Sequence, residues 1–239
     1  MTLFLAIFYQ CYIVDSMNKK EKEQGRKKRV AKIVRYLKKA YPHPKSELKY
    51  KTNFQFVVAV VLSAQCTDKV VNRVTKILFR KYKTAKDFSF LNSQELENKI
   101  KHIPFFRNKA KSIIAAAKVI VGEFGGRVPR TEKEITRLPG VGYKTAHVIL
   151  GELFGVWEGI ATDTHVRRFA LRFDLTDNTD LTKISKDLEQ LIPKKDWKYV
   201  NNGLVLYGRY ICPARKHDCS KHALTKIWPP AENRWPKVK

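Results

Sequence analysis

The stretch LPGVGYKTA, at residues 138–146, decides how this chain is organised. Two apolar residues flank a turn formed by a proline and a glycine, and a second glycine lets the backbone come close to another group. Upstream, a Thr-Glu-Lys-Glu sequence is typical of a capping box that opens a short helix, residues 132–137. Downstream, residues 145–154 carry apolar side chains at helical spacing and are followed by a glycine. The stretch is therefore predicted to form a helix, a tight hairpin and a second helix.

Such a hairpin is suited to an anionic ligand. Its small residues expose successive backbone N–H groups at the start of a helix, where a negatively charged oxygen such as a DNA phosphate is favoured. The same local pattern is equally compatible with an ordinary turn between two helices of a core. The candidate DNA-binding residues of the stretch are Leu138, Gly140, Val141, Gly142 and Thr145.

The composition indicates a globular protein with a polyanionic partner. The chain has 239 residues and a hydrophobic content of 44%, enough for one domain or two small ones. It contains 48 Lys and Arg against 22 Asp and Glu, which gives a net charge of +26. Nucleic acid is the first partner that this charge suggests and an anionic membrane is the second. A solvated basic surface, or a generally basic proteome, is the alternative.

Neither secretion nor membrane insertion is indicated. No run approaches the roughly 18 apolar residues that span a bilayer. Residues 1–14 are apolar but lack a basic segment and a small-residue cleavage site, so residues 1–16 are interpreted as a mis-assigned extension or dispensable tail ahead of Met17. We expect a cytoplasmic protein. The four cysteines are scattered and do not resemble a disulfide framework: Cys11, Cys66, Cys212 and Cys219.

The rest of the chain is predicted to be helical, since no segment alternates with a period of two. The fold class is therefore all-α. The helix at 68–82 is expected to bury Val70, Val71, Val74, Ile77 and Leu78. The other expected helices are 26–40, 54–62, Asn92–Ile100, 110–124, Asp163–Phe173, 183–191 and 196–210, with Asn92 and Asp163 as N-caps.

Three segments together resemble endonuclease III, a DNA glycosylase with abasic-site lyase activity in the helix-hairpin-helix superfamily. They are LSAQCTD at 62–68, LPGVGYKTA at 138–146 and ATDTH at 161–165. The resemblance runs from about Ser46 to Cys219, in the same order and at compatible spacing. A hairpin alone would be weak evidence, but the hairpin together with a lysine and an aspartate at the expected positions is specific.

The resemblance implies two helical domains with the active site in the cleft between them. The continuous domain, with six helices and the helix-hairpin-helix motif, is expected at 46–157. The other domain is expected to be assembled from both chain ends, residues 17–45 with 158–239.

The resemblance also assigns catalytic residues. Lys144 would be the nucleophile that attacks C1′ of the damaged nucleotide and forms a Schiff base, for which its amine must be neutral. Asp163 would stabilise the charge on the sugar or assist proton transfer, and its alternative role as an N-cap is compatible with this. His165 is expected to be structural.

Two further residues are expected to act on the DNA stack. Gln65 resembles the family residue that fills the gap left by a flipped nucleotide. Phe105 stands at the position of an apolar wedge on the opposite strand. The alternatives are a helix cap for Gln65 and burial in the core for Phe105.

The C-terminal region departs from the family. Endonuclease III carries a C-x6-C-x2-C-x5-C pattern that holds a [4Fe–4S] cluster. Cys212 and Cys219 match the first two ligands, but His222 and Trp228 stand at the other two positions. Because four thiolates are the usual requirement, the sequence predicts no cluster and no metal.

A zinc site is an alternative for the same region, made by Cys212, His217, Cys219 and His222, although its C-x4-H-x-C-x2-H spacing is tight for one ion. Basic residues of this region are expected to contact phosphate even without a metal. They are Arg209, Arg215 and Lys216.

The overall prediction is a bifunctional DNA glycosylase and abasic-site lyase of base excision repair. It would act as a monomer on double-stranded DNA, remove oxidised pyrimidines and cleave 3′ of the abasic site by β-elimination. A monofunctional adenine or mismatch glycosylase is one alternative, although such relatives usually lack a lysine at position 144. A non-enzymatic binder of damaged DNA is the other.

Overall fold

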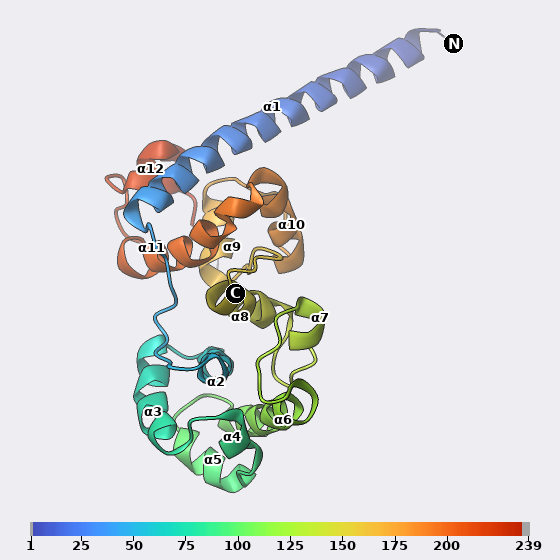
Figure 1. Cartoon of the computed structure of the whole chain (residues 1–239). Helices are drawn as coiled ribbons and strands as arrows, with labels where there is room; N and C mark the ends of the chain where they lie inside the picture. The colour runs from blue at the N-terminus through green and yellow to red at the C-terminus, as the bar shows by residue number, and fades with distance from the viewer. Residues whose placement is uncertain (1, 236–239) are drawn as a thin grey trace. The chain divides into compact units, whose positions relative to one another are not determined.

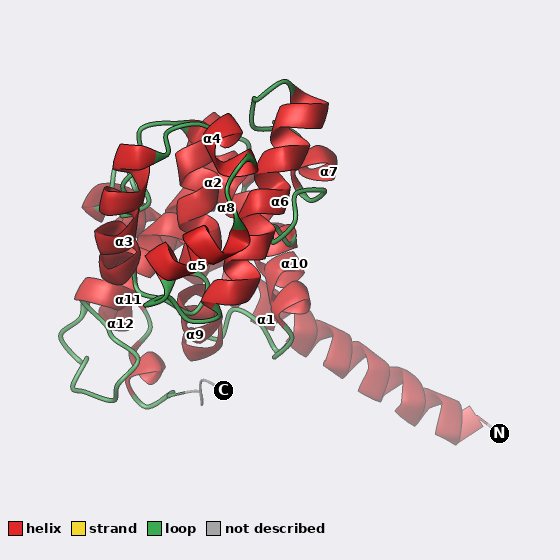
Figure 2. Cartoon of the chain, turned by 90° about the horizontal axis from the view of Figure 1, so that it is seen from below, coloured by secondary structure: helices red, strands yellow, loops and turns green. Residues whose placement is uncertain are grey.

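The computed structural model describes residues 2–235, with side chains from residue 19 onwards. Every regular element in this part of the chain is a helix, and Figure 2 contains no strand in it. The all-α prediction is therefore confirmed. The interpretation of residues 1–16 as an extension stays a prediction, because the side chains of these residues lie outside the described ones. Over the residues described, no helix is both long and apolar enough to cross a membrane.

The chain divides into two compact units (Figure 1). One is continuous, Lys45–Ala161, and the other joins Met1–Pro44 to Thr162–Lys239. The continuous unit contains α2 (Asn53–Ser63), α3 (Asp68–Lys81), α4 (Ala85–Ser89), α5 (Ser93–Ile100), α6 (Phe106–Phe124), α7 (Glu132–Ile135) and α8 (Tyr143–Phe154).

Helix α2 is the centre of the continuous unit. Every residue from Phe54 to Leu62 is buried, and α2 packs against α3, α6 and α8. A helix that is apolar on all sides needs such neighbours, because no face of it is suited to water. Thr52 caps α2 by accepting a hydrogen bond from the N–H of Gln55. The predicted core helix is confirmed.

Helix α3 buries a narrower face than predicted. Val71, Val74 and Leu78 are buried, whereas Val70 is half-buried and the Ile77 side chain is 70% exposed. Positions 71, 74 and 78 follow one stripe of the helix, and positions 70 and 77 lie together on its flank. Ile77 was therefore wrongly included in the core.

The discontinuous unit is built around the C-terminal half of α1 (Thr2–Ala40), where Val30, Ile33, Val34 and Leu37 are buried. Its other helices are α9 (Thr164–Arg172), α10 (Leu181–Leu191), α11 (Leu204–Tyr210) and α12 (Ala223–Ile227). The predicted helix 196–210 is interrupted: a 3-10 turn at Lys194–Asp196 and a π-helical turn at Tyr199–Gly203 precede α11.

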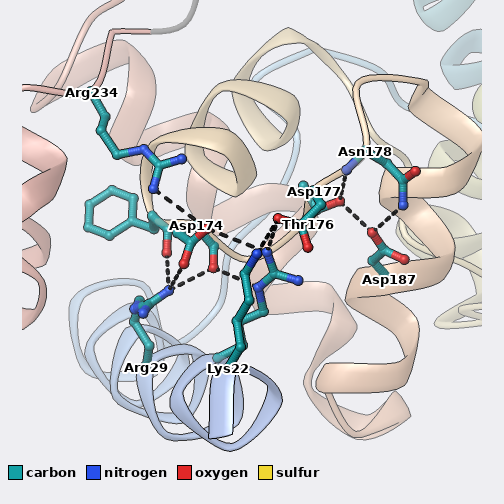
Figure 3. A network of polar contacts seen from close by, with 10 residues as sticks. Lys22, Arg29, Asp174, Thr176, Asp177, Asn178, Asp187 and Arg234 are labelled. Atoms are coloured by element: carbon teal, nitrogen blue, oxygen red, sulfur yellow. Dashed lines mark hydrogen bonds and ion pairs between the residues drawn. The ribbon is translucent and has the colours of Figure 1, made fainter. Parts of the chain in front are cut away.

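Charged residues of α1 hold the two halves of this unit together (Figure 3). Arg29 donates to the carbonyl oxygens of Phe173 and Asp174, over 2.7 and 2.6 Å. Arg26 pairs with Asp177 over 2.7 Å. These contacts join residues that are about 150 positions apart, so the N-terminal helix is an integral part of the unit.

Candidate active site

The hairpin between α7 and α8 is fixed to the core of the continuous unit. Gly140 has φ +83°, and a Cβ atom added there would lie 2.8 Å from Cβ of Ser112 in α6. Leu138 and Val141 are buried in the core, and the N–H of Val141 donates to the carbonyl of Leu138 over 3.0 Å. Since both apolar side chains face inward, a ligand at this turn would meet its main chain instead of Leu138 or Val141.

Helix α8 starts two residues earlier than predicted, which places Lys144 inside its first turn. Gly142 is the N-cap, with no side-chain cap, and a Cβ atom there would have open space around it. Lys144 and Tyr143 are exposed, and Thr145 is half-buried. The first N–H groups of a 12-residue helix thus begin at an open glycine.

The two helices of the motif contact each other through side chains. The buried His147 of α8 lies 2.5 Å from Oε2 of Glu132 in α7, measured from Nε2. Thr131 caps α7 by accepting from the N–H of Glu134, whose carboxylate accepts from the Thr131 hydroxyl. The predicted cap is confirmed, although the reciprocal bond is made by the hydroxyl instead of the Thr131 N–H.

Asp163 is the N-cap of α9, in the discontinuous unit. Its Oδ1 accepts from the N–H groups of His165 and Val166, over 2.9 and 2.8 Å. These two bonds fix the orientation of a half-buried carboxylate. His165 packs against α11, where a Cβ atom added to Gly208 would lie 2.3 Å from Nδ1.

Gln65 and Phe105 share an unusual backbone conformation. Their φ angles are +55° and +58°, in the left-handed region that few residues other than glycine adopt. Gln65 lies between the C-cap of α2, Ala64, and the N-cap of α3, Thr67, so it caps neither helix. Phe105 is 62% exposed, which excludes burial in the core. Both side chains are thus held on the surface of the continuous unit.

The basic candidates of the C-terminal region are all exposed. They are Arg209 in α11 and, in the loop that follows, Arg215 and Lys216.

Comparison with known proteins decides the family. Residues 58–194 match the HhH-GPD superfamily of base excision DNA repair proteins. The chain is 43% identical over 211 residues to "Endonuclease III" of Synechocystis sp., covering 88% of this chain and 96% of that protein. It is 44% identical to "Endonuclease III" of Bacillus subtilis over 78% of this chain and 85% of that one. The chain belongs to the endonuclease III family.

The solved structure of a non-covalent endonuclease III–DNA complex has the same fold, with a TM-score of 0.80 and 36% identity over 87% of this chain and 97% of that chain. The structure of a trapped endonuclease III–DNA covalent intermediate gives the same values. Membership makes this endonuclease III homologue a DNA glycosylase of base excision repair.

The prediction that this endonuclease III homologue has no metal or cluster site was wrong. Cys212, His217 and His222 bring one ligand atom each to within 4.8 Å of one another. Cys219 is buried, and its Sγ accepts from the same Arg172 guanidinium as Sγ of Cys212. The prediction rested on the family pattern, in which two of the four cysteine positions are filled by other residues. The structure instead brings His217, a member of the alternative zinc site, close to Cys212 and His222.

The buried nitrogens of the two histidines fit a metal centre. Nε2 of His217 and Nδ1 of His222 are buried and have no hydrogen-bond partner among the described residues. An orphaned imidazole nitrogen is costly to bury, whereas a metal ion would satisfy both. Two thiolates and two imidazoles are a known ligand set for zinc. The same set can hold a [2Fe–2S] centre, with the two imidazoles on one iron and the two thiolates on the other. A bound metal would fix the 212–222 loop.

Arg172 and Trp228 complete the surroundings of this centre. Arg172 is fully buried and donates to Sγ of Cys212 and of Cys219, over 3.0 and 3.1 Å. Burial raises the pKa of the Cys212 thiol and the Arg172 guanidinium opposes that rise. Trp228, at the fourth ligand position of the family, packs against Phe173 and under the Arg29 guanidinium instead.

Proposed function

We propose that the chain is a bifunctional DNA glycosylase and abasic-site lyase that removes oxidised pyrimidines, with Lys144 as the nucleophile. It would act as a monomer on cytoplasmic double-stranded DNA that contains damaged bases or abasic sites. The observation that carries the proposal is the exposed amine of Lys144 in the first turn of α8, directly after a hairpin that is fixed to the core.

The hairpin would bind the DNA backbone through its N–H groups. A phosphate at the start of α8 is favoured by the helix dipole and by the unpaired N–H groups of the first turn. A phosphate held at Gly142 would bring the neighbouring deoxyribose within reach of Lys144, two residues further on. The net charge of +26 would attract the DNA over a longer range.

The reaction follows from a neutral amine beside the sugar. Nζ of Lys144 forms a bond to C1′, the bond from C1′ to the base breaks, and the base leaves with the electron pair and takes up a proton. The nitrogen then loses a proton, and the C1′–O4′ bond opens as O4′ takes up a proton, which gives a protonated Schiff base. Removal of a C2′ proton then expels the 3′ phosphate by β-elimination. Water finally hydrolyses the Schiff base and restores the amine.

Asp163 would stabilise the positive charge that develops on the sugar, or accept the proton that the amine loses. Its two main-chain hydrogen bonds would keep the carboxylate oriented without further rearrangement. Gln65 would fill the gap left by the flipped nucleotide, and Phe105 would unstack the opposite strand. The exposure of both side chains supports these roles.

The solved relatives support a covalent mechanism. One of the two structures with a TM-score of 0.80 is described as a trapped covalent intermediate of endonuclease III with DNA, in an estranged-adenine complex. The equivalent intermediate in this chain would be the Lys144 Schiff base, which borohydride reduces to a stable amine.

Borohydride trapping on a duplex with one abasic site tests the nucleophile. We expect a covalent protein–DNA adduct with the wild-type chain and none with Lys144→Ala. Lys133→Ala is the matched control, since Lys133 is an exposed lysine of α7 in the same motif, and it should retain the adduct. An adduct that survives Lys144→Ala would assign the nucleophile elsewhere.

The same proteins and duplexes distinguish the proposed function from the two alternative functions. Base release without strand cleavage would indicate a monofunctional glycosylase, and DNA binding without either would indicate a non-enzymatic binder. A panel of duplexes, each with a single lesion, identifies the base that is removed, and oxidised pyrimidines should react fastest. The logarithm of the DNA-binding constant should fall by about 0.9 per log unit of salt concentration for each phosphate neutralised.

A further inference from the structure

Lys109 is a lysine whose charge lies inside the continuous unit. It belongs to the first turn of α6 and is only 7% exposed. Its Nζ donates to the carbonyl oxygens of Leu62, over 2.9 Å, and of Ala64, over 2.6 Å. Burying an ammonium group is costly, so a lysine at this position needs a specific reason.

The carbonyls that Lys109 binds belong to the end of α2. The last turn of a helix leaves carbonyl groups without an intrahelical partner, and a cation there interacts favourably with the helix dipole. The last turn of α2 contains no basic residue of its own. The hydroxyl of Ser63 and the N–H of Cys66 satisfy two further carbonyls, those of Val60 and Ser63. Lys109 therefore completes the C-terminal cap of α2 from another helix.

Lys109 also contacts the loop before α6, which contains Phe105, a residue with a left-handed backbone like that of Gln65. Its N–H donates to the carbonyl of Phe105 over 3.1 Å, which is the first hydrogen bond of α6. One residue thus joins Phe105, through its main chain, to Ala64, the neighbour of Gln65, through its side chain. Both joined loops carry an exposed residue with φ near +57°. Such a backbone is strained in residues other than glycine and persists only where the surroundings impose it.

We propose that Lys109 is a positioning residue that holds Gln65 and Phe105 in the geometry needed to enter the DNA stack. The inference rests on the proposed function, because it assigns Lys109 to the step in which the nucleotide is flipped. Lys109 does not contact the sugar or the base. It acts through the two loops, and it fixes the distance between the residue that fills the gap and the residue that unstacks the opposite strand.

Burial also lowers the pKa of the Lys109 ammonium, which agrees with its position between apolar elements.

Lys109→Met keeps the length and volume of the side chain and removes both hydrogen bonds that the ammonium makes. Lys118→Met is the matched control, since Lys118 is an exposed lysine further along the same helix. Lys109→Gln retains a donor on a shorter chain and should fall between wild type and Lys109→Met.

The kinetic test is a double-mutant cycle on duplex DNA with one lesion. We expect Lys109→Met to lower the single-turnover rate by roughly 10- to 100-fold, with little change in DNA binding, because the hairpin is unaltered. If Lys109 acts through Gln65, adding Gln65→Ala to Lys109→Met should cost less than Gln65→Ala costs alone. Effects that multiply would overturn the proposal, as would an equal loss with Lys118→Met.

Amide hydrogen exchange of the free protein tests the same geometry without any reaction. Lys109→Met should accelerate exchange in residues 62–66, which lose the ammonium, and leave the hairpin at 138–142 unchanged. It should also accelerate exchange in residues 103–107: the main-chain bond from Lys109 to Phe105 remains, but the start of α6 is no longer fixed to the end of α2. Unchanged exchange in the two loops, or a uniform increase throughout the unit, would overturn the positioning role. A wild-type chain that neither releases a base nor cleaves DNA would refute the proposed function, and the exchange measurement would still decide whether Lys109 holds the loops.

Discussion

Among single residues, Gly140 and Gly142 have opposite requirements although they stand two positions apart. Gly140 has a positive φ angle and lies against Ser112, so an added methyl group meets both backbone strain and a clash. Gly142 has φ −82° and open space around it. Gly140 is therefore needed by the fold, and Gly142 keeps free the surface where a phosphate would approach.

This difference gives a matched pair of alanine variants. Gly140→Ala should lower the free energy of unfolding by about 2 kcal/mol, from strain and the contact with Ser112. Gly142→Ala should change it by less than about 0.5 kcal/mol, yet weaken DNA binding by roughly tenfold if a phosphate binds at this N-terminus. Urea unfolding and fluorescence anisotropy measure the two quantities. Unaltered DNA binding by Gly142→Ala would remove the phosphate from this position.

The capping and catalytic roles of Asp163 can be tested separately, because asparagine is as good an N-cap as aspartate. Asp163→Asn should retain stability within about 0.5 kcal/mol and lower the rate of base excision by about 100-fold or more. Asp163→Ala should lose the activity together with about 1 kcal/mol of stability. If Asp163→Asn retained the wild-type rate, the carboxylate would be a cap only.

For the helices, the hydrophobic pattern predicted the long elements and a capping box predicted the four-residue α7, whereas α4 and α12 were missed. Helix α2 and the capped starts of α5 and α9 agree with the sequence because apolar runs and N-caps are local signals. Helices α4 and α12 have only five residues each, too few to show a helical period. The π-helical turn before α11 also lacks a local signal, since tertiary packing decides where a helix widens.

The candidate site shows the same limit in its side chains. The hairpin, Lys144 and Asp163 could be proposed from sequence because they lie in short contiguous motifs. Lys109 could not, because its partners are about 45 residues away in the sequence. His217 could be named only as one of four candidate zinc ligands with tight spacing, because an irregular loop brings it to Cys212 and His222. An unexplained basic residue beside an apolar run is the only trace that Lys109 leaves in the sequence.

The loop from Cys212 to His222 contains the ligands of the proposed metal centre. We expect the purified chain to retain metal after gel filtration, as measured by elemental analysis, and Cys212→Ser to lose it, since the site would keep only one thiolate. Cys66→Ser is the control, because Cys66 is a half-buried free cysteine of the other unit. A wild-type chain that contains no metal, or Cys212→Ser with undiminished metal, would contradict the assignment.

Over the whole chain, α1 is part of a unit whose other helices all come after residue 161. Its cationic residues hold a loop that has its own strained residue, since Asp174 has φ +49°. Asp174 and Asp177 accept from α1, while Thr176 and Asn178 of the same loop bind Asp187 of α10 (Figure 3). The loop thus joins the N-terminal helix to α10.

The stability of this connection should depend on pH in a predictable direction. Hydrogen bonds from Arg26 and Lys22 lower the pKa of Asp177 from 3.8 to about 2. Because the pKa is depressed in the folded chain, the stabilisation is fully present above pH 4 or so and is lost as the pH falls through about 2. The Asp177 side chain is 62% exposed, so solvent screening limits the contribution to about 1 kcal/mol or less.

Asp177→Asn should lose this amount of stability at pH 7, and its free energy of unfolding should approach that of the wild type as the pH approaches 2. Urea unfolding between pH 7 and pH 2 measures both quantities, with Glu23→Gln, an exposed acid of α1 that pairs with Lys27 of the same helix, as the control. If the difference between Asp177→Asn and wild type were the same at every pH, the ion pairs of Asp177 would not contribute to holding α1 in place.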